Sequence, residues 1–160
     1  MDQKKLKLLA LLRKNNREKL TNLSRKTHVP VSTIFESLRN NFSKFILKHT
    51  CIVDFSYIGF NIKAMLLIKF KPENKNEGLN YLTKSIFVNS LSRINNGYDV
   101  TLEIICKDMN ALEDFIEKLE LNTKIKKKEV FYLMGDIKKE DFFSNPDLIS
   151  GLLIENEVKW

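Results

Sequence analysis

Hydrophobic residues recur at helical spacing in the first third of the chain. The first predicted helix carries a broad apolar stripe of Leu6, Leu8, Leu9, Leu11 and Leu12. Asp2 is its candidate N-cap, and Asn15–Asn16 its candidate end. A second helix is predicted over 18–27 and a third over 31–40, because Pro30 disfavours helix at the residue before it. A long helix followed by two short ones across a tight turn is typical of a helix-turn-helix domain.

The third predicted helix has one apolar and one polar side. We expect Val31, Ile34 and Leu38 to face the core. The outward positions, which a major groove would meet, are Ser32, Thr33, Glu36, Ser37 and Arg39. The flanking cations that are candidates for phosphate contacts are Arg17, Lys19, Arg25 and Lys26. Two simpler interpretations remain open: Arg17 forms contacts within this domain, and Ser32 and Thr33 only cap the helix.

The periodicity changes after residue 60. Residues that alternate over 61–70 predict a strand. The spacing of Leu79, Leu82 and Ile86 predicts a short helix after it, and residues 87–94 and 98–106 predict two further strands. Asn95-Asn96-Gly97 between these strands predicts a tight turn, because Asn and Gly tolerate positive φ. A clear amphipathic helix follows, with Met109, Leu112, Phe115, Ile116 and Leu119 on one side, and residues 128–134 close as a strand. The order βαββαβ predicts an α+β protein, with a ferredoxin-like domain after the helix-turn-helix.

These elements divide the chain into three segments. Residues 1–54 form the predicted helix-turn-helix domain, whose final stretch 41–54 is a short extended connector, either a wing or a hinge. Residues 55–140 form the ferredoxin-like domain. Residues 141–160 are a C-terminal extension, in which Asn145-Pro146 is a candidate helix start.

One face of the predicted sheet is left uncovered by its own domain. Both helices of a ferredoxin-like domain lie on the same side, so the residues on the other side meet solvent or a partner. The apolar residues expected there are Met65, Leu67 and Ile105. Because an exposed apolar sheet face normally marks an interface, the sequence predicts a homodimer through this face.

Composition narrows the functional classes. The chain of 160 residues is 43% apolar, enough for a packed core, and no apolar run approaches the length of a membrane span. Two distant cysteines, Cys51 and Cys106, make neither a disulfide framework nor a four-ligand zinc site, and a reducing cytoplasm is expected. No metal cluster, nucleophile–base pair or phosphate-binding glycine loop is visible, so we expect no cofactor and no enzyme activity.

The positive charge is concentrated in the first third of the chain. Residues 1–54 carry 12 basic and 4 acidic residues, a balance of +8, whereas residues 55–160 carry 15 and 16, a balance of −1. This asymmetry indicates a polyanion-binding segment joined to a near-neutral domain. A lysine-rich solvated surface is the alternative interpretation.

Taken together, these motifs resemble the Lrp/AsnC family of feast/famine transcription regulators over roughly residues 2–140. The residues that carry the resemblance are Asn16-Arg17, Leu23-Ser24-Arg25-Lys26-Thr27, Val29-Pro30-Val31-Ser32-Thr33-Ile34, Val53-Asp54 with Ile58-Gly59-Phe60, and Asn95-Asn96-Gly97-Tyr98-Asp99. The resemblance implies a regulator that binds double-stranded DNA and dimerises through its ferredoxin-like domain. It also implies assembly into tetramers or octamers, and an amino-acid effector near Asn96, Tyr98 and Asp99.

The chain also departs from the family pattern. His28 replaces the turn glycine between the two DNA-reading helices, Ser37 stands where an arginine is usual, and Asn96 replaces the glycine of the Gly-x-Tyr-Asp turn. Residues 41–45 lack the usual Leu-Glu-x-x-Gly. These departures indicate a divergent member with altered DNA recognition. Tyr98 and Asp99 then have a second interpretation as turn and strand-pairing residues without a ligand.

Three functions remain open from the sequence. The first is a DNA-binding transcription regulator modulated by an amino acid or a related metabolite. The second is a DNA-independent ligand-binding or co-assembly partner with a degenerate helix-turn-helix. The third is an enzyme that resembles sirohaem decarboxylases, which share this two-domain layout, but both histidines, His28 and His49, precede residue 50 and leave the ferredoxin-like domain with none.

Overall fold

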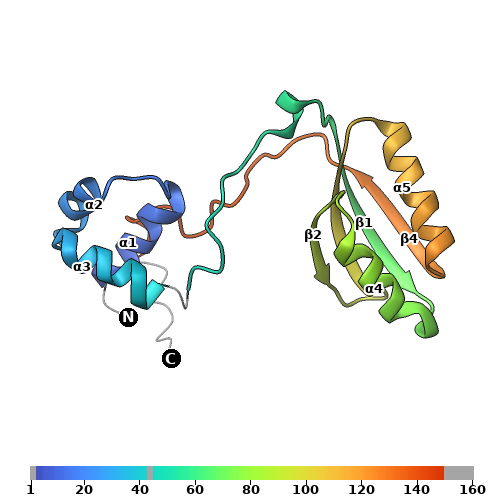
Figure 1. Ribbon diagram of the computed structural model, residues 1–160, viewed down its shortest axis with the longest axis horizontal. Helices are drawn as coiled ribbons and strands as arrows, with labels where there is room; N and C mark the ends of the chain where they lie inside the picture. Colours follow the sequence, from blue (N-terminus) through green and yellow to red (C-terminus); the bar gives the residue numbers. More distant parts are fainter. Residues whose placement is uncertain (1–2, 43–44, 150–160) are drawn as a thin grey trace. The chain divides into compact units, whose positions relative to one another are not determined.

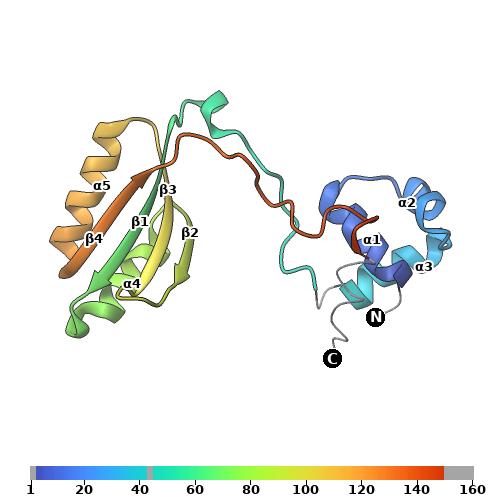
Figure 2. The same ribbon diagram turned by 180° about the vertical axis from the view of Figure 1, so that it is seen from behind.

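The computed structural model describes residues 3–42 and 45–149, which fall into two compact units (Figures 1 and 2). The helical unit combines the described residues of Met1–Cys51 with those from Ile137 onward, and the sheet unit spans Ile52–Asp136. From the sequence we expected domain boundaries after residues 54 and 140, with residues 141–160 as an extension separate from both domains. In the structure, the described part of that extension belongs to the helical unit.

The helical unit begins with three helices, α1 (Gln3–Lys14), α2 (Leu20–Thr27) and α3 (Val31–Glu36). The third predicted helix is divided, because the chain continues after α3 as a π-helical turn, η1 (Ser37–Asn41). Asn15 follows the last residue of α1 and donates its amide to Leu11 O at 2.9 Å, as expected for the end of a helix. Asp2, the candidate N-cap of α1, lies outside the described residues.

A small core joins these helices. Its buried side chains are Leu8, Leu12, Leu23, Ile34 and Phe42. The sequence had assigned Phe42 to the connector, yet its ring is only 1% exposed, because η1 carries the chain back over the helices. The expectation that Val31 faces the core was wrong: its side chain is 39% exposed. Residues 46–54 contain neither helix nor strand, so this described part of the connector forms no strand of a wing.

The chain returns to α1 after the sheet unit. Arg13 Nη2 lies 2.8 Å from Glu140 Oε2, and Arg13 Nε donates a hydrogen bond to the carbonyl of Phe142. Ala10, nearly one turn before Arg13, is fully buried. Residues 146–148, where the sequence predicted a helix start, form a turn; Ile149 is helical and buried, and the predicted residues from 150 on lie outside the described part of the chain.

The sheet unit has the expected βαββαβ order. Its elements are β1 (Ile62–Phe70), α4 (Lys75–Lys84), β2 (Val88–Arg93), β3 (Val100–Cys106), α5 (Met109–Asn122) and β4 (Ile125–Tyr132), with short 3₁₀ turns η3 (Phe55–Ile58) and η4 (Pro72–Asn74). The four strands form one antiparallel sheet in the order β2-β3-β1-β4. The helix that begins at Lys75 ends before Ile86, whose side chain is 92% exposed, so the assignment of Ile86 to its apolar face was wrong.

Both helices cover the same face of the sheet (Figure 1). Alternate residues of β1 (Ala64, Leu66, Ile68, Phe70) are buried against Leu82 of α4 and against Leu112, Phe115 and Leu119 of α5. The contact between α4 and β1 is close, because a Cβ added at Gly78 would lie 2.3 Å from the Phe70 ring. The opposite face of the sheet therefore carries the intervening residues of each strand.

No helix in the described part of the chain is both long and apolar enough to cross a bilayer.

Candidate functional sites

The turn between α2 and α3 depends on an unusual backbone conformation at His28. This residue has φ 55° and ψ 35°, the left-handed region that glycine adopts most readily. His28 therefore occupies a glycine-type position without the freedom of glycine. Thr27 Oγ1 closes the end of α2 by donating to Leu23 O at 2.7 Å, and Pro30 O accepts from Ile34 N at the start of α3. These bonds fix the geometry of a helix-turn-helix despite the substitution.

The outward side of α3 holds most of the residues expected there. Ser32, Thr33 and Glu36 of α3 and Arg39 of η1 are all exposed. Ser37 is an exception and corrects the expectation, because it is only 5% exposed. It follows the buried Ile34 by three residues and so lies on the same side of the helix. Sequence reasoning missed Phe35, an apolar ring that is 56% exposed on α3.

The cations of α2 form a connected surface. Glu18 Oε2 lies 3.1 Å from Lys26 Nζ, and Glu18 Oε1 accepts from Asn22 Nδ2, whose own Oδ1 accepts from Arg25 Nη2. The hydrogen bond from Asn22, followed by that from Lys26, lowers the pKa of Glu18. Lys26 is thus paired with a carboxylate, whereas Arg17 and Lys19 are exposed just before α2.

The Asn95-Asn96-Gly97 turn has the predicted geometry. Asn96 has φ 59° and Gly97 has φ 90°, so the positive-φ interpretation of this sequence is confirmed. The two residues after the turn then point into different surroundings. The Tyr98 hydroxyl donates to Glu129 Oε1 of β4, and Lys127 Nζ lies 4.5 Å from the centre of the Tyr98 ring.

Asp99 is already fully bonded within the sheet unit. Its side chain is 6% exposed; Oδ2 accepts from the amide of Phe70 at 3.0 Å, and Oδ1 lies 2.6 Å from Lys75 Nζ and 3.4 Å from Lys69 Nζ. Burial alone would raise the pKa of this carboxyl, but the hydrogen bonds from Lys75 and Phe70 outweigh burial, and the pKa is lowered. Asp99 therefore joins three segments of the unit.

The strand register places Met65, Leu67 and Ile105 on the face that α4 and α5 leave uncovered. Met65 is paired with Glu103 and Leu67 with Thr101. Ile105 is paired with Lys63, which lies two residues before Met65 and so on the same face of β1. The register also brings Phe131 of β4, 44% exposed, opposite Met65. Phe131 was missed because the sequence alone does not reveal which residues of β4 align with β1.

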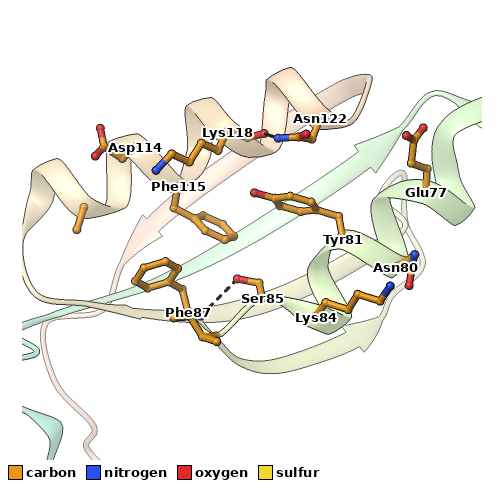
Figure 3. A pocket seen from close by; sticks show the side chains of 12 residues that line it. Glu77, Asn80, Tyr81, Lys84, Ser85, Phe87, Asp114, Phe115, Lys118 and Asn122 are labelled. Atoms are coloured by element: carbon orange, nitrogen blue, oxygen red, sulfur yellow. Dashed lines mark hydrogen bonds between the residues drawn. The ribbon is translucent and has the colours of Figure 1, made fainter.

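An open groove of about 580 Å³ separates α4 from α5 on the helix-covered side of the sheet (Figure 3). Tyr81, Phe87 and Phe115 supply aromatic rings, and the rings of Phe87 and Phe115 meet edge to face with centroids 6.0 Å apart. Charged residues of both signs, among them Lys84 and Asp114, stand along its edges. The sequence contained no signal for this groove, because it exists only where two distant helices meet.

Among the residues that the structure describes, no group of His, Cys, Asp and Glu side chains could hold a metal ion. Cys51 is exposed and Cys106 is buried, and both are free thiols. Burial, followed by the charge of Asp108, raises the pKa of Cys106, so this thiol stays protonated and inert.

Comparisons with known proteins find sequence relatives over about two thirds of the chain and solved structures with the same fold over most of it. No family model matches the sequence. HTH-type transcriptional regulator FL11 of Pyrococcus furiosus is 29% identical over 112 residues, which cover 69% of this chain and 74% of that protein. A transcriptional regulator from Neisseria meningitidis, solved in complex with L-Met, superposes with a TM-score of 0.80 at 17% identity, over 87% of this chain and 93% of that one. An AsnC family regulator from Agrobacterium tumefaciens superposes with a TM-score of 0.78 at 15% identity, over 87% of this chain and 94% of that one.

Proposed function

We propose that this chain, a divergent relative of the Lrp/AsnC-type helix-turn-helix regulators, binds double-stranded DNA through its helical unit and regulates transcription. The observation that carries this function is the surface of α2 and α3, where four exposed polar positions on α3 and η1 lie beside the cations of α2. A relative with 29% identity is named as a transcriptional regulator, and the solved structures with this fold are regulators as well. None of these names describes an enzyme, and we assign no catalytic residue.

The exposed residues divide into two roles on DNA. Arg17, Lys19, Arg25 and Lys26 are suited to phosphates, which position the protein without reading sequence. Ser32, Thr33 and Glu36 are suited to base edges, because hydroxyls bond to any base and a carboxylate accepts from cytosine. Phe35 adds an apolar contact of the kind that thymine methyl groups accept. Ser37 has no place in this interface, since it is buried.

Self-association through the uncovered sheet face completes the regulator. Met65, Leu67 and Phe131 are incompletely buried apolar residues of that face, beside Ile105, which is 9% exposed. A second copy is the partner that we infer for them, because an exposed apolar sheet face normally marks an interface. A two-fold dimer would present two reading helices to the two halves of a palindromic site. Tetramers or octamers of such dimers are the further assembly that the resemblance implies.

An amino acid or a related metabolite is the proposed effector. The Neisseria regulator with this fold was solved with L-Met, and the Asn96–Asp99 turn is the place that the resemblance assigns. Because the carboxylate of Asp99 is already bonded to Phe70 and Lys75, its role would be to position the turn and not to contact the ligand. Asn96 and Tyr98 are the residues left to face a ligand, and Tyr98 would do so together with Glu129 and Lys127.

The experiment that tests the function is DNA retention by the full chain. Mobility shifts on genomic fragments at low salt should show retention that weakens steeply as salt rises, because bound lysines and arginines release counterions. The double variant Ser32→Ala/Thr33→Ala should lose discrimination between specific and random fragments while keeping weak binding to both. No retention at low salt would contradict the function and favour the alternative, a DNA-independent ligand-binding or co-assembly partner. The buried Ser37 and the π-helical turn after α3 are the observations that keep this alternative in view.

A further inference from the structure

The charges of the sheet unit are separated although they balance. Residues 52–136 contain 12 basic and 12 acidic residues, so the unit is neutral as a whole. Seven of the twelve basic residues nevertheless fall in two short segments, 69–75 and 124–128. Acidic residues gather instead on α5, which carries Glu113, Asp114, Glu117 and Glu120. The sheet unit is therefore neutral in total but carries its positive charge mainly in one region, so that region can attract an anion.

The fold brings the two lysine-rich segments together. Phe70, the last residue of β1, is paired with Ile125, the first residue of β4, and Lys71 donates its amide to Lys124 O at 2.9 Å. The end of β1 and the start of β4 thus form one corner of the sheet. We call this corner the lysine corner; it comprises Lys69, Lys71, Lys75, Lys124, Lys126 and Lys127.

The strand register adds positive charge at the same place. Lys69 lies directly opposite Lys127 on neighbouring strands, an arrangement of like charges that destabilises a sheet. A register shift follows at once, because Phe70 is paired with Ile125 and Lys126 is left without a cross-strand partner. Such a bulge redirects side chains at the edge of a sheet. Lys126 is exposed and adds a further positive charge at this corner.

The carboxylates at the corner neutralise only part of this charge. Lys69 and Lys75 share the single carboxylate of Asp99, and Lys127 lies 3.1 Å from Glu129. Lys71, Lys124 and Lys126 are exposed and have no ion pair within the described part of the chain. Glu73, two residues after Lys71, is the remaining acidic group on the adjoining turn η4. The corner thus keeps an excess of about three positive charges that the protein does not satisfy itself.

We propose that the lysine corner binds the phosphate backbone of DNA and extends the contact of the regulator beyond its helix-turn-helix. This inference rests on the proposed function, because DNA is the polyanion that the helical unit is proposed to bind. Lys71, Lys124 and Lys126, the exposed lysines of the corner without an ion pair in the described chain, do not line the groove between α4 and α5, so they suit a repeating line of charge better than an enclosed small ligand. DNA presents one negative charge about every 1.7 Å along its axis, so the contact needs no particular base sequence.

Two double variants of the full chain test the inference. Lys124→Gln/Lys126→Gln removes two charges from the corner, and Lys84→Gln/Lys118→Gln removes two exposed charges from α4 and α5 as a matched control. Fluorescence anisotropy with a long duplex over a salt series should show a shallower slope of log K against log salt in the first variant, by about 0.9 for each phosphate that it no longer neutralises. The control variant, and Lys124→Arg/Lys126→Arg, should keep the wild-type slope. Equal melting temperatures would show that all variants fold.

The outcomes separate this inference from the proposed function. Arg25→Gln on α2 is included in the same series. If the wild type binds DNA and Arg25→Gln weakens it, while the corner variant keeps the wild-type slope, the lysine corner does not touch DNA and the proposed function stands. If the wild type binds no duplex at low salt, the proposed function fails first. A changed particle mass of the corner variant in the absence of DNA would assign the corner to contacts between copies and overturn the inference.

Discussion

Lys75 Nζ lies 2.6 Å from Asp99 Oδ1, and this pair connects the first residue of α4 to the residue before β3. The same carboxylate accepts from the amide of Phe70 at the end of β1. One side chain that is 6% exposed thus joins three segments of the sheet unit. It stands beside the turn that the resemblance assigns to an effector, so its bonding affects both stability and the shape of that turn.

Asp99 is expected to make the stability of the sheet unit depend on acid. Its pKa is lowered in the folded chain, so its contribution is present above the pKa of the unfolded chain and is lost as the pH falls through the lowered folded value. Asp99→Asn should cost about 1–3 kcal/mol at neutral pH, as expected for a charged hydrogen-bonding group. The free energy of unfolding of Asp99→Asn should then change less than that of the wild type as the pH falls below about 4. Urea unfolding at a series of pH values measures both effects.

The matched control for this prediction is Asp114→Asn, which removes a carboxylate from the exposed side of α5. If Asp99→Asn and Asp114→Asn gave the same stability at every pH, the contacts of Asp99 would not contribute to folding.

His28 is expected to be a site where glycine stabilises the protein. Its φ of 55° is unfavourable for a residue with a side chain, and this backbone conformation costs on the order of 1 kcal/mol. His28→Gly should therefore raise the melting temperature of the helical unit by a few degrees. His49→Gly is the control, because His49 lies in the connector and does not have a positive φ. A lower melting temperature for His28→Gly would show that the imidazole makes a compensating contact.

Gly78 is expected to tolerate no side chain. A Cβ at this position would lie 2.3 Å from the Phe70 ring, and that ring is 1% exposed and cannot move away. Gly78→Ala should destabilise the sheet unit by about 1–3 kcal/mol, although alanine is normally the better helix former. Gly135→Ala serves as the control, since nothing lies within 4 Å of its added Cβ. Chemical unfolding that found the two variants equally stable would contradict the close contact of α4 with β1.

The uncovered sheet face is expected to hold two copies together. Leu67→Glu places a charge among Met65, Ile105 and Phe131, so it should convert a dimer into a monomer in light scattering at micromolar concentration. Ile86→Glu adds the same charge at a position that is 92% exposed and should leave the mass unchanged. A monomeric mass for the wild type would itself exclude a dimer through this face.

Local pattern was sufficient for most of the secondary structure. The α5 helix was predicted from its apolar spacing, and Leu112, Phe115 and Leu119 are its buried residues. The positive φ at Asn96 and Gly97 was predicted because turn chemistry is a property of a few adjacent residues. The alternation along β1 placed Met65 and Leu67 on the face opposite the core, and the structure agrees.

Local pattern failed where distant segments decide the environment. Ser37 has the polarity of a surface residue, but the π-helical turn after α3 buries it. Phe42 was expected in a connector, yet it closes the core of the helical unit. Val31 was expected inside and is 39% exposed, because it is the first residue of α3 and lies beyond the core that Ile34 and Leu38 reach from the same helix side.

The sequence by itself determined the order of the elements and the positive charge of the first third, because periodicity and charge are readable along a single chain. Only the tertiary structure decided that the segment after Ile137 returns to Arg13, that Asp99 is held by Lys69 and Lys75, and that the lysines of 69–75 and 124–128 share one corner. Those three facts depend on strand register and on the path of the chain through space. Register and path follow from packing between residues far apart in sequence, which no local window contains.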